Sequence, residues 1–443
     1  MNKEELKYLN LILLHVGIGF LVFVFPFSAK IYGYAIFILG AYFIVRTQNK
    51  NNEALMAAAY VVGSEVFLRM THGNPLYEIS KYGVIVYILM GMYFSGFSKG
   101  AAPYWIFLLL LVPSVVLSTF VLNFDAKIKN TIAFNISGPV CLGVASIYTF
   151  RRKIPIGQMN NILLSMGLPI ISCMIYLTFY TPNIRDIVTS TQSNYETSGG
   201  FGPNQVATIL GMGMFIFFSR IIVESRTKYV LMMNLIVALL ITYRGVVTFS
   251  RGGMITGVLM ITLFVFFLYF KSNLGGRLKL NYLIILVVIA LIVTWSYTSF
   301  QTGGLIDKRY ANQDAAGRTK DTQFTGREEV ALSEWDTFLK NPIFGAGVGK
   351  GAELRKAATG DGTLSHDEIT RMLAEHGTLG IFALLILFFT PLVLYVENKF
   401  NLYLLCFVAF WFLTINHASM RIAAPAFVYS LSLLNVYFDK SVG

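Results

Sequence analysis

The chain has 443 residues, of which 55% are hydrophobic and only 13% are charged, and its mean hydropathy is +0.63. Soluble proteins have about a quarter of their residues charged, so this composition excludes an ordinary soluble domain and predicts a polytopic membrane protein. Lys and Arg outnumber Asp and Glu by 35 to 23. We attribute the excess to basic cytoplasmic loops and an anionic substrate, and not to nucleic acid.

Cysteine and histidine usage gives no sign of a metal site. Cys141, Cys173 and Cys406 all fall within apolar segments, where a free cysteine behaves as a small hydrophobe. No Cys or His spacing resembles a metal cluster. The sequence therefore predicts no disulfide framework, no bound metal and no cofactor. The start of the chain, Met1 to Lys7, runs into an apolar segment without a small-residue cleavage site, which predicts a retained first helix.

Apolar segments of spanning length recur along the chain. A helix needs roughly 20 apolar residues to cross the bilayer, and the sequence predicts an all-α transmembrane bundle of about 12–14 spans. The candidate spans are residues 8–26, 31–46, 54–70, 82–98, 103–122, 132–150, 161–181, 204–223, 229–249, 253–270, 281–299, 378–396, 400–416 and 421–438. The third is the weakest, because Glu65 and Arg69 interrupt it.

Lys and Arg are more frequent in the short loops on the side of the N-terminus, which predicts that both termini are cytoplasmic. The chain then divides into transmembrane helices 1–11 over residues 1–299, a long polar loop on the opposite side of the membrane over 300–377 and C-terminal transmembrane helices over 378–443. We expect no separate soluble domain.

The polar segment before the last spans contains two matched tetrads, Thr325-Gly-Arg327-Glu328 and Ser365-His366-Asp-Glu368. Each has the capping-box pattern and predicts a helix start. The first helix, over 327–340, is expected to bury a face made of apolar side chains, and the second is expected to run from His366 to about Glu375 and to end at Gly377. The buried face of the first helix would consist of Ala331, Trp335, Phe338 and Leu339. The glycine-rich turn over 344–351 would bring the two helix starts together, and residues 305–321, which have no clear period, are predicted to form a mobile loop.

Arginines near predicted helix starts are candidates for binding an anion. Arg251 follows Ser250, which can cap, and Arg244 lies seven residues earlier on nearly the same helical face. Arg327 lies in the first turn of its helix, where free N–H groups attract anions. A planar guanidinium binds two oxygens of a diphosphate at once. Arg251, Arg327 and Arg244 are therefore predicted to bind diphosphate; an interfacial arginine that snorkels into water is the alternative for Arg251, and a solvated first-turn arginine for Arg327.

Histidines supply the candidate base. At a helix N-terminus the dipole disfavours imidazolium, so His366 would be neutral and able to accept a proton; an ordinary surface histidine is the alternative. His376 is expected to contact the last carbonyls of the same helix. His417 and Arg421 are expected to line a substrate path, and Asn204 either caps a helix or binds sugar hydroxyls, capping being the commoner role. The glycine-rich turn lacks the context of a nucleotide loop, which argues against ATP.

Four stretches in this order resemble the signature of the O-antigen ligase and O-antigen polymerase superfamily. They are Thr248-Phe-Ser-Arg251-Gly-Gly, Gly326-Arg327 followed by Trp335, Asn341 to Gly349, and Ser365-His366-Asp-Glu followed by Leu373 to Gly380. The resemblance covers roughly residues 199–381. Two features depart from it: the common His-Asn pair is His-Asp here, and the number of predicted spans exceeds the twelve usual for ligases.

The resemblance implies a bacterial inner-membrane glycosyltransferase of the GT-C type that acts on the periplasmic face in lipopolysaccharide biosynthesis. Its donor would be a glycan on undecaprenyl diphosphate. A ligase passes this glycan to a sugar of the lipid A core, whereas a polymerase passes it to another lipid-linked repeat unit, and both remain open. The positions of His366, Arg251 and Arg327 match the essential residues of the family. We expect a metal-independent displacement with inversion; a transporter of lipid-linked sugars is the remaining alternative.

Overall fold

The computed structural model describes residues 2–123, 127–320, 327–360, 362, 364–399 and 401–438, except for the side chains of Arg327 and Thr359. Within these residues the chain is almost entirely helical. The helices of the first half are α1 (Lys3–Val24), α2 (Ser28–Thr47), α3 (Glu53–Met70), α4 (Ile79–Ser95), α5 (Ala102–Val121), α6 (Ile128–Thr149), α7 (Ile156–Tyr180), α8 (Ile184–Ile187), η1 (Glu196–Ser198) and α9 (Pro203–Val223). Those of the second half are α10 (Lys228–Val247), α11 (Arg251–Lys271), α12 (Leu274–Gln301), α13 (Leu305–Tyr310), α14 (Arg327–Lys340), α15 (Lys350–Thr359), α16 (Glu368–Glu397), α17 (Leu404–Ile415) and α18 (Ala423–Leu431). A short parallel ladder joins β1 (Lys153–Pro155) to β2 (Asn435–Tyr437).

Ten helices in the described part of the chain are long and apolar enough to cross a membrane, and α4 and α17 are shorter apolar helices. The chain is therefore a polytopic helical membrane protein, which confirms the predicted fold class. The predicted weakest span is the helix α3, which is outside the ten. The predicted span 421–438 is wrong in its second half, because α18 ends at Leu431 and the chain enters β2 at Asn435.

Contacts divide the chain into two compact units, which are described separately. Unit 1 consists of residues 1–47, 51–79 and 157–321, and unit 2 of residues 48–50, 80–156 and 322–443. The predicted division of the chain at residues 299 and 377 concerns its placement in a membrane, and it stays a prediction.

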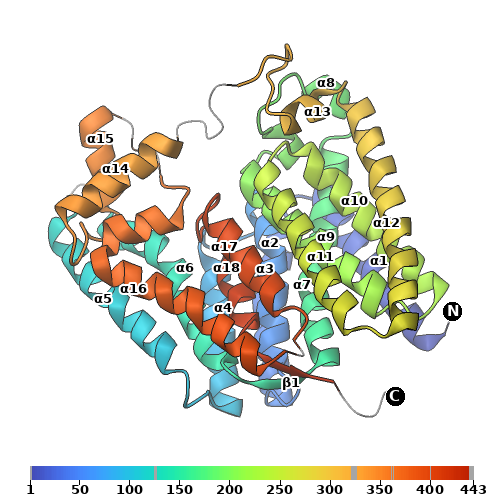
Figure 1. Ribbon diagram of the computed structural model, residues 1–443, viewed down its shortest axis with the longest axis horizontal. Coiled ribbons are helices and arrows are strands. Elements are labelled where there is room, and N and C mark those ends of the chain that lie inside the picture. Colours follow the sequence, from blue (N-terminus) through green and yellow to red (C-terminus); the bar gives the residue numbers. More distant parts are fainter. Residues whose placement is uncertain are drawn as a thin grey trace. The chain divides into compact units, whose positions relative to one another are not determined.

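In unit 1, α9 packs against both α10 and α11, and α12 lies beside α10 (Figure 1). Glycine makes the α9–α11 contact possible: a Cβ on Gly253 would lie 2.3 Å from the carbonyl carbon of Ala207, and one on Gly211 would lie 2.2 Å from the carbonyl oxygen of Gly253. Small residues of this kind let transmembrane helices approach closely. The N-terminus of α11 is thereby fixed beside the first turns of α9.

Polar connections gather at one end of the α9–α12 group, where Figure 1 shows α8 and α13. The predicted mobile loop over 305–321 is wrong for its described part. It forms α13 and a tight bridge between Gln313 and Thr319. In this helix and bridge the backbone N–H and C=O groups form hydrogen bonds. Hydrophobic periodicity alone did not reveal these short elements.

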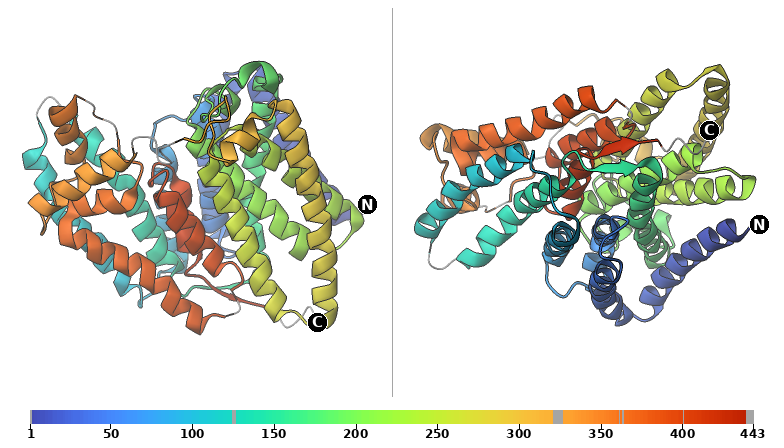
Figure 2. Two further views of the ribbon diagram at one scale, coloured as in Figure 1. Left: turned by 45° about the horizontal axis from the view of Figure 1, so that its top comes forward. Right: turned by 90° about the horizontal axis from the view of Figure 1, so that it is seen from below.

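In unit 2, α5 packs against α6 and α16, α6 packs against α18, and α14 lies on α16 (Figure 2). The predicted helix over 327–340 is confirmed as α14, but its predicted buried face is wrong. The side chains of Trp335 and Leu339 are 47% and 59% exposed, whereas Glu334 and Thr337 are buried. α14 therefore docks through a polar face.

The predicted stop at Gly377 is confirmed as a break inside α16, where φ is 61° and ψ is −142°. The glycine-rich turn was predicted to bring two helix starts together. In the structure it packs against the break at Gly377 instead. The N–H groups of Ala346 and Gly347 donate to the carbonyls of Ala374 and Glu375 at 2.9 and 3.2 Å. The turn thus fixes the end of the helix that His366 precedes.

Candidate functional site

In unit 2 a cavity of about 400 Å³ opens between α14 and the segment that leads into α16. Its lining is rich in groups that bind or exchange protons. The lining residues are Glu328, Val330, Ala331, Glu334, Ser365, His366, Asp367, Thr370, Asn416 and His417. Two imidazoles and three carboxyl groups in one cavity suit a ligand that carries hydroxyl groups.

His366 lies two residues before α16 and not inside its first turn. The predicted capping box at Ser365 is wrong: Asp367 is the N-cap, and its carboxylate accepts from the N–H of Ile369 at 2.8 Å. Asp and Ser cap about equally well, so the sequence did not distinguish the two. The corresponding prediction for the tetrad at 325–328 falls on Thr325 and Gly326, which lie outside the described residues.

The backbone around His366 is held from the 416–421 segment. The N–H of Ser419 donates to the carbonyl of His366 at 3.2 Å, and the guanidinium of Arg421 donates to the carbonyl of Ser365. Arg421 lines a separate, smaller cavity with Ser365, Glu368 and Arg371. Of the two residues predicted to line a substrate path here, His417 shares the cavity of His366, whereas Arg421 holds the backbone beside it.

Glu334 on α14 connects three elements at this cavity. Its carboxylate lies 3.1 Å from the guanidinium of Arg355 on α15 and accepts from the hydroxyls of Ser365 and Thr370 at 3.1 and 2.6 Å. Burial raises the pKa of Glu334, while the two hydroxyls and Arg355 oppose that shift. Burial also raises the pKa of Asp367, against the N–H bond from Ile369. Both carboxyl groups therefore keep a proton to higher pH than exposed ones do.

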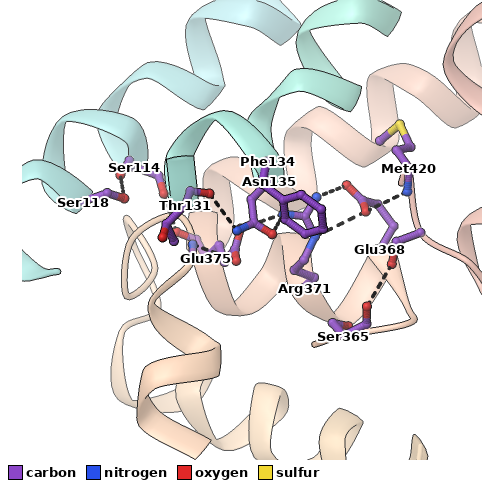
Figure 3. Close-up of polar contacts among 12 residues, drawn as sticks. Ser114, Ser118, Thr131, Phe134, Asn135, Ser365, Glu368, Arg371, Glu375 and Met420 are labelled. Carbon is purple, nitrogen blue, oxygen red and sulfur yellow. Dashed lines mark hydrogen bonds and ion pairs between the residues drawn. The ribbon is translucent and has the colours of Figure 1, made fainter. Parts of the chain in front are cut away.

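A second buried ionic group stabilises the first turns of α16 (Figure 3). Arg371 lies between Glu368 and Glu375, with a distance of 2.9 Å from its Nη1 to Glu375 Oε2. The N–H of Met420 donates to Glu368, and the N–H of Gly349 donates to Glu375 at 2.9 Å. The arginine thus joins the glycine-rich turn and the 416–421 segment to the helix that follows His366.

His376 does not make the predicted contacts with terminal carbonyls. It is 1% exposed, and neither ring nitrogen has a hydrogen-bond partner within the described part of the chain. The carbonyls of Ala374 and Glu375, just before the break at Gly377, accept from the N–H groups of Ala346 and Gly347 instead.

Arg327 is the first residue of α14, as predicted, and its side chain lies outside what the structure describes. It belongs to unit 2 with His366, whereas Arg251 belongs to unit 1.

In unit 1, Arg251 is the first residue of α11 and is half-buried. Ser250 occupies the N-cap position, but its side chain makes no capping bond and instead donates to Asn204 Oδ1 at 2.8 Å. The capping role preferred for Asn204 is wrong, because Gly202 is the N-cap of α9. The structure therefore brings Asn204 to the start of α11, next to Arg251.

Two further cations lie close to Arg251. Arg309, in α13, accepts a hydrogen bond from Arg251 Nη1 through its carbonyl at 3.3 Å. Lys320 follows in the same connection, and its pKa is lowered by burial and by the charges of Arg309 and Arg251. The charges of Arg251 and Arg309 also act on Tyr310. Burial raises the pKa of Tyr310 to about 12, while the two arginines oppose that shift. The start of α11 is thus a strongly positive region.

Arg244 is placed differently. It is 3% exposed, and its guanidinium donates to the carbonyls of Leu177 and Thr181 at the end of α7. Near-complete burial together with these two bonds favours a structural role for Arg244 at the end of α7.

Three residues of these sites were missed from the sequence. Glu334 lies on α14, and the apolar residues of this helix led to the prediction that another face is buried. Arg309 and Lys320 stood in a segment without periodicity; their positive charge was the available signal. No group of three or more His, Cys, Asp or Glu that could hold a metal ion occurs in the described ranges.

Comparison with known proteins assigns the central part of the chain to a family. No curated protein matches the chain. Residues 235–385, however, match the family model described as O-Antigen ligase. This region runs from α10 to the middle of α16 and contains Arg251, Arg309, Arg327 and His366. The chain therefore carries a domain of the O-antigen ligase family, whose members are membrane glycosyltransferases.

Proposed function

We propose that the protein transfers a glycan from undecaprenyl diphosphate to a sugar of the lipid A core on the periplasmic face of the inner membrane, with inversion at the anomeric carbon. The observation that carries this proposal is the cavity of about 400 Å³ lined by His366, which belongs to the region that matches the O-antigen ligase family. A base beside a cavity with carboxyl groups suits activation of a sugar hydroxyl.

In the proposed reaction His366 takes the proton of the acceptor hydroxyl. The acceptor oxygen forms a bond to the anomeric carbon as the bond from that carbon to the diphosphate oxygen breaks, and the electron pair leaves with undecaprenyl diphosphate. Arg251 and Arg327 stabilise the charge that develops on the diphosphate, an effect of about 3–4 kcal/mol for one well-placed donor.

The carrier lipid has a matching environment in unit 1. A cavity of about 290 Å³ lies among α9, α10, α11 and α12, and its lining is almost wholly apolar. Val258, Thr262 and Val265 line it from α11. With a rotation of 100° per residue, these three positions share a helical face with Arg251. A polyprenyl chain whose diphosphate lies at Arg251 would extend along this face.

A disrupted gene distinguishes the two transferases of the family. Loss of all polymer on the lipid A core, with lipid-linked polymer accumulating, is the result expected of a ligase in electrophoresis of lipopolysaccharide. Retention of one repeat unit on the core would instead assign the protein as a polymerase. Unchanged lipopolysaccharide would contradict both assignments.

A further inference from the structure

We propose that Arg309 and Lys320 form, together with Arg251, a cradle that binds the diphosphate of the lipid-linked donor. The inference rests on the proposed function and adds two residues that bind the leaving group. It is carried by the geometry of the connection that follows α12, where two segments distant in sequence bring three cations to one helix start.

Two hydrogen bonds fix the guanidinium of Arg309 near the start of α11. Its Nε donates to the carbonyl of Phe249 at 2.9 Å, and one Nη donates to the hydroxyl of Ser193 at 3.3 Å. Phe249 has φ of 58°, a backbone conformation that an aromatic residue rarely adopts. Arg309 thus binds the strained turn directly before α11, and its guanidinium lies near the first residue of that helix.

Lys320 is held on the same connection by a hydrogen bond to Thr191. Its ammonium group donates to the hydroxyl of Thr191 at 3.0 Å, and Thr191 in turn donates to the carbonyl of Gln313. The bridge between Gln313 and Thr319 brings the chain back toward α13. The side chain of Lys320 is therefore fixed on a folded connection. It lies close enough to Arg309 and Arg251 for their charges to lower its pKa.

The charges of Arg309 and Arg251 lower the pKa of Lys320, and Asp314, which opposes this shift, also pairs with Arg318 at 2.8 Å between Oδ2 and Nε. A diphosphate bound by the three cations would relieve the repulsion between them. The amide groups of the first turn of α11 have no side-chain cap, so they add to the attraction for an anion.

The chemistry favours a diphosphate over a single carboxylate or phosphate. A planar guanidinium binds two oxygens of a phosphate group, whereas an ammonium group acts as a point charge. Two arginines and one lysine match the several anionic oxygens that a diphosphate carries. The diphosphate is also the part of the donor that gains charge as the glycan leaves.

The test measures binding of undecaprenyl diphosphate and of undecaprenyl monophosphate to the purified full-length protein in detergent. Lys320→Gln and Arg309→Gln are each expected to weaken diphosphate binding about tenfold or more, as for loss of a charge-assisted hydrogen bond. The loss for monophosphate should be smaller. Lys308→Gln is the matched control, because Lys308 adjoins Arg309 but donates to the carbonyl of Ala315, and this variant should bind like wild type.

Arg309 also holds the turn at Phe249, so an effect of Arg309→Gln on binding has to be separated from an effect on folding. Arg309→Lys, which keeps the charge, and the melting temperature of each variant make this separation. Diphosphate binding by folded Lys320→Gln and Arg309→Gln that equals wild type would overturn the proposal. If wild type binds undecaprenyl diphosphate and these variants do not, yet no glycan transfer occurs in wild type, the cradle stands and the proposed transferase reaction fails.

Discussion

Replacement of Glu334 by alanine tests how the cavity around His366 is held. In the structure its side chain is 2% exposed and pairs with Arg355, which is 8% exposed, at 3.1 Å. Removing one partner of a buried ion pair costs about 3–5 kcal/mol, because the remaining charge is left without compensation. The hydroxyl of Thr370 loses its acceptor as well, at about 1 kcal/mol, whereas the hydroxyl of Ser365 still donates to the carbonyl of Asp367 at 2.8 Å.

These terms share one environment and do not simply add, so we expect Glu334→Ala to lose about 3–5 kcal/mol of stability. The assay is the melting temperature of the purified protein in detergent. The double variant Glu334→Ala, Arg355→Ala should recover part of the loss, since it also removes the buried guanidinium that had paired with Glu334. A single variant that melts like wild type, or a double variant no more stable than Glu334→Ala, would refute the role assigned to this carboxylate.

Three further results are expected. Burial raises the pKa of Glu334 above its ordinary value of 4.5, so its contribution to stability is largest below that value and is lost as the pH rises through the folded-state pKa; the melting temperature of wild type should therefore fall relative to Glu334→Gln between acidic and neutral pH. Gly345→Ala should melt well below Gly303→Ala: both glycines have positive φ, but a Cβ on Gly345 would lie 2.2 Å from the carbonyl carbon of Glu375, whereas Gly303 has no such neighbour. Arg244→Gln should destabilise the protein, because the carbonyls of Leu177 in α7 and of Thr181 directly after it lose their donor, while protein that stays folded keeps its affinity for undecaprenyl diphosphate.

Hydropathy and helix punctuation predicted much of the fold. Long apolar segments have few alternatives to a membrane helix, so the spans from α1 to α12 were recognisable. The bounds of α14 and the break at Gly377 followed from Pro342 and from the freedom of glycine at positive φ. The last span was overestimated, because hydropathy does not distinguish a short strand such as β2 from the end of a helix.

The candidate site was predicted in part. His366 and His417 were named separately, and the structure places both on one cavity. The role of their neighbour Glu334 could not be predicted, because it depends on contacts with three elements and not on a local sequence pattern. The same holds for Arg309 and Lys320: positive charge is visible in the sequence, but the tight bridge that brings Lys320 back is a tertiary feature. The N-cap was wrongly assigned to Ser365 and not to Asp367, because local rules rank Ser and Asp about equally as caps.

The central claim is that His366 is the base of a glycosyl transfer. Its most direct test is the reaction of purified protein in liposomes with an undecaprenyl diphosphate-linked glycan and a lipid A core acceptor, without ATP or an ion gradient. Wild type should form the joined glycan with inverted anomeric configuration, and His366→Ala should form none while it melts at the wild-type temperature. Product formed by His366→Ala at the wild-type rate would contradict the claim.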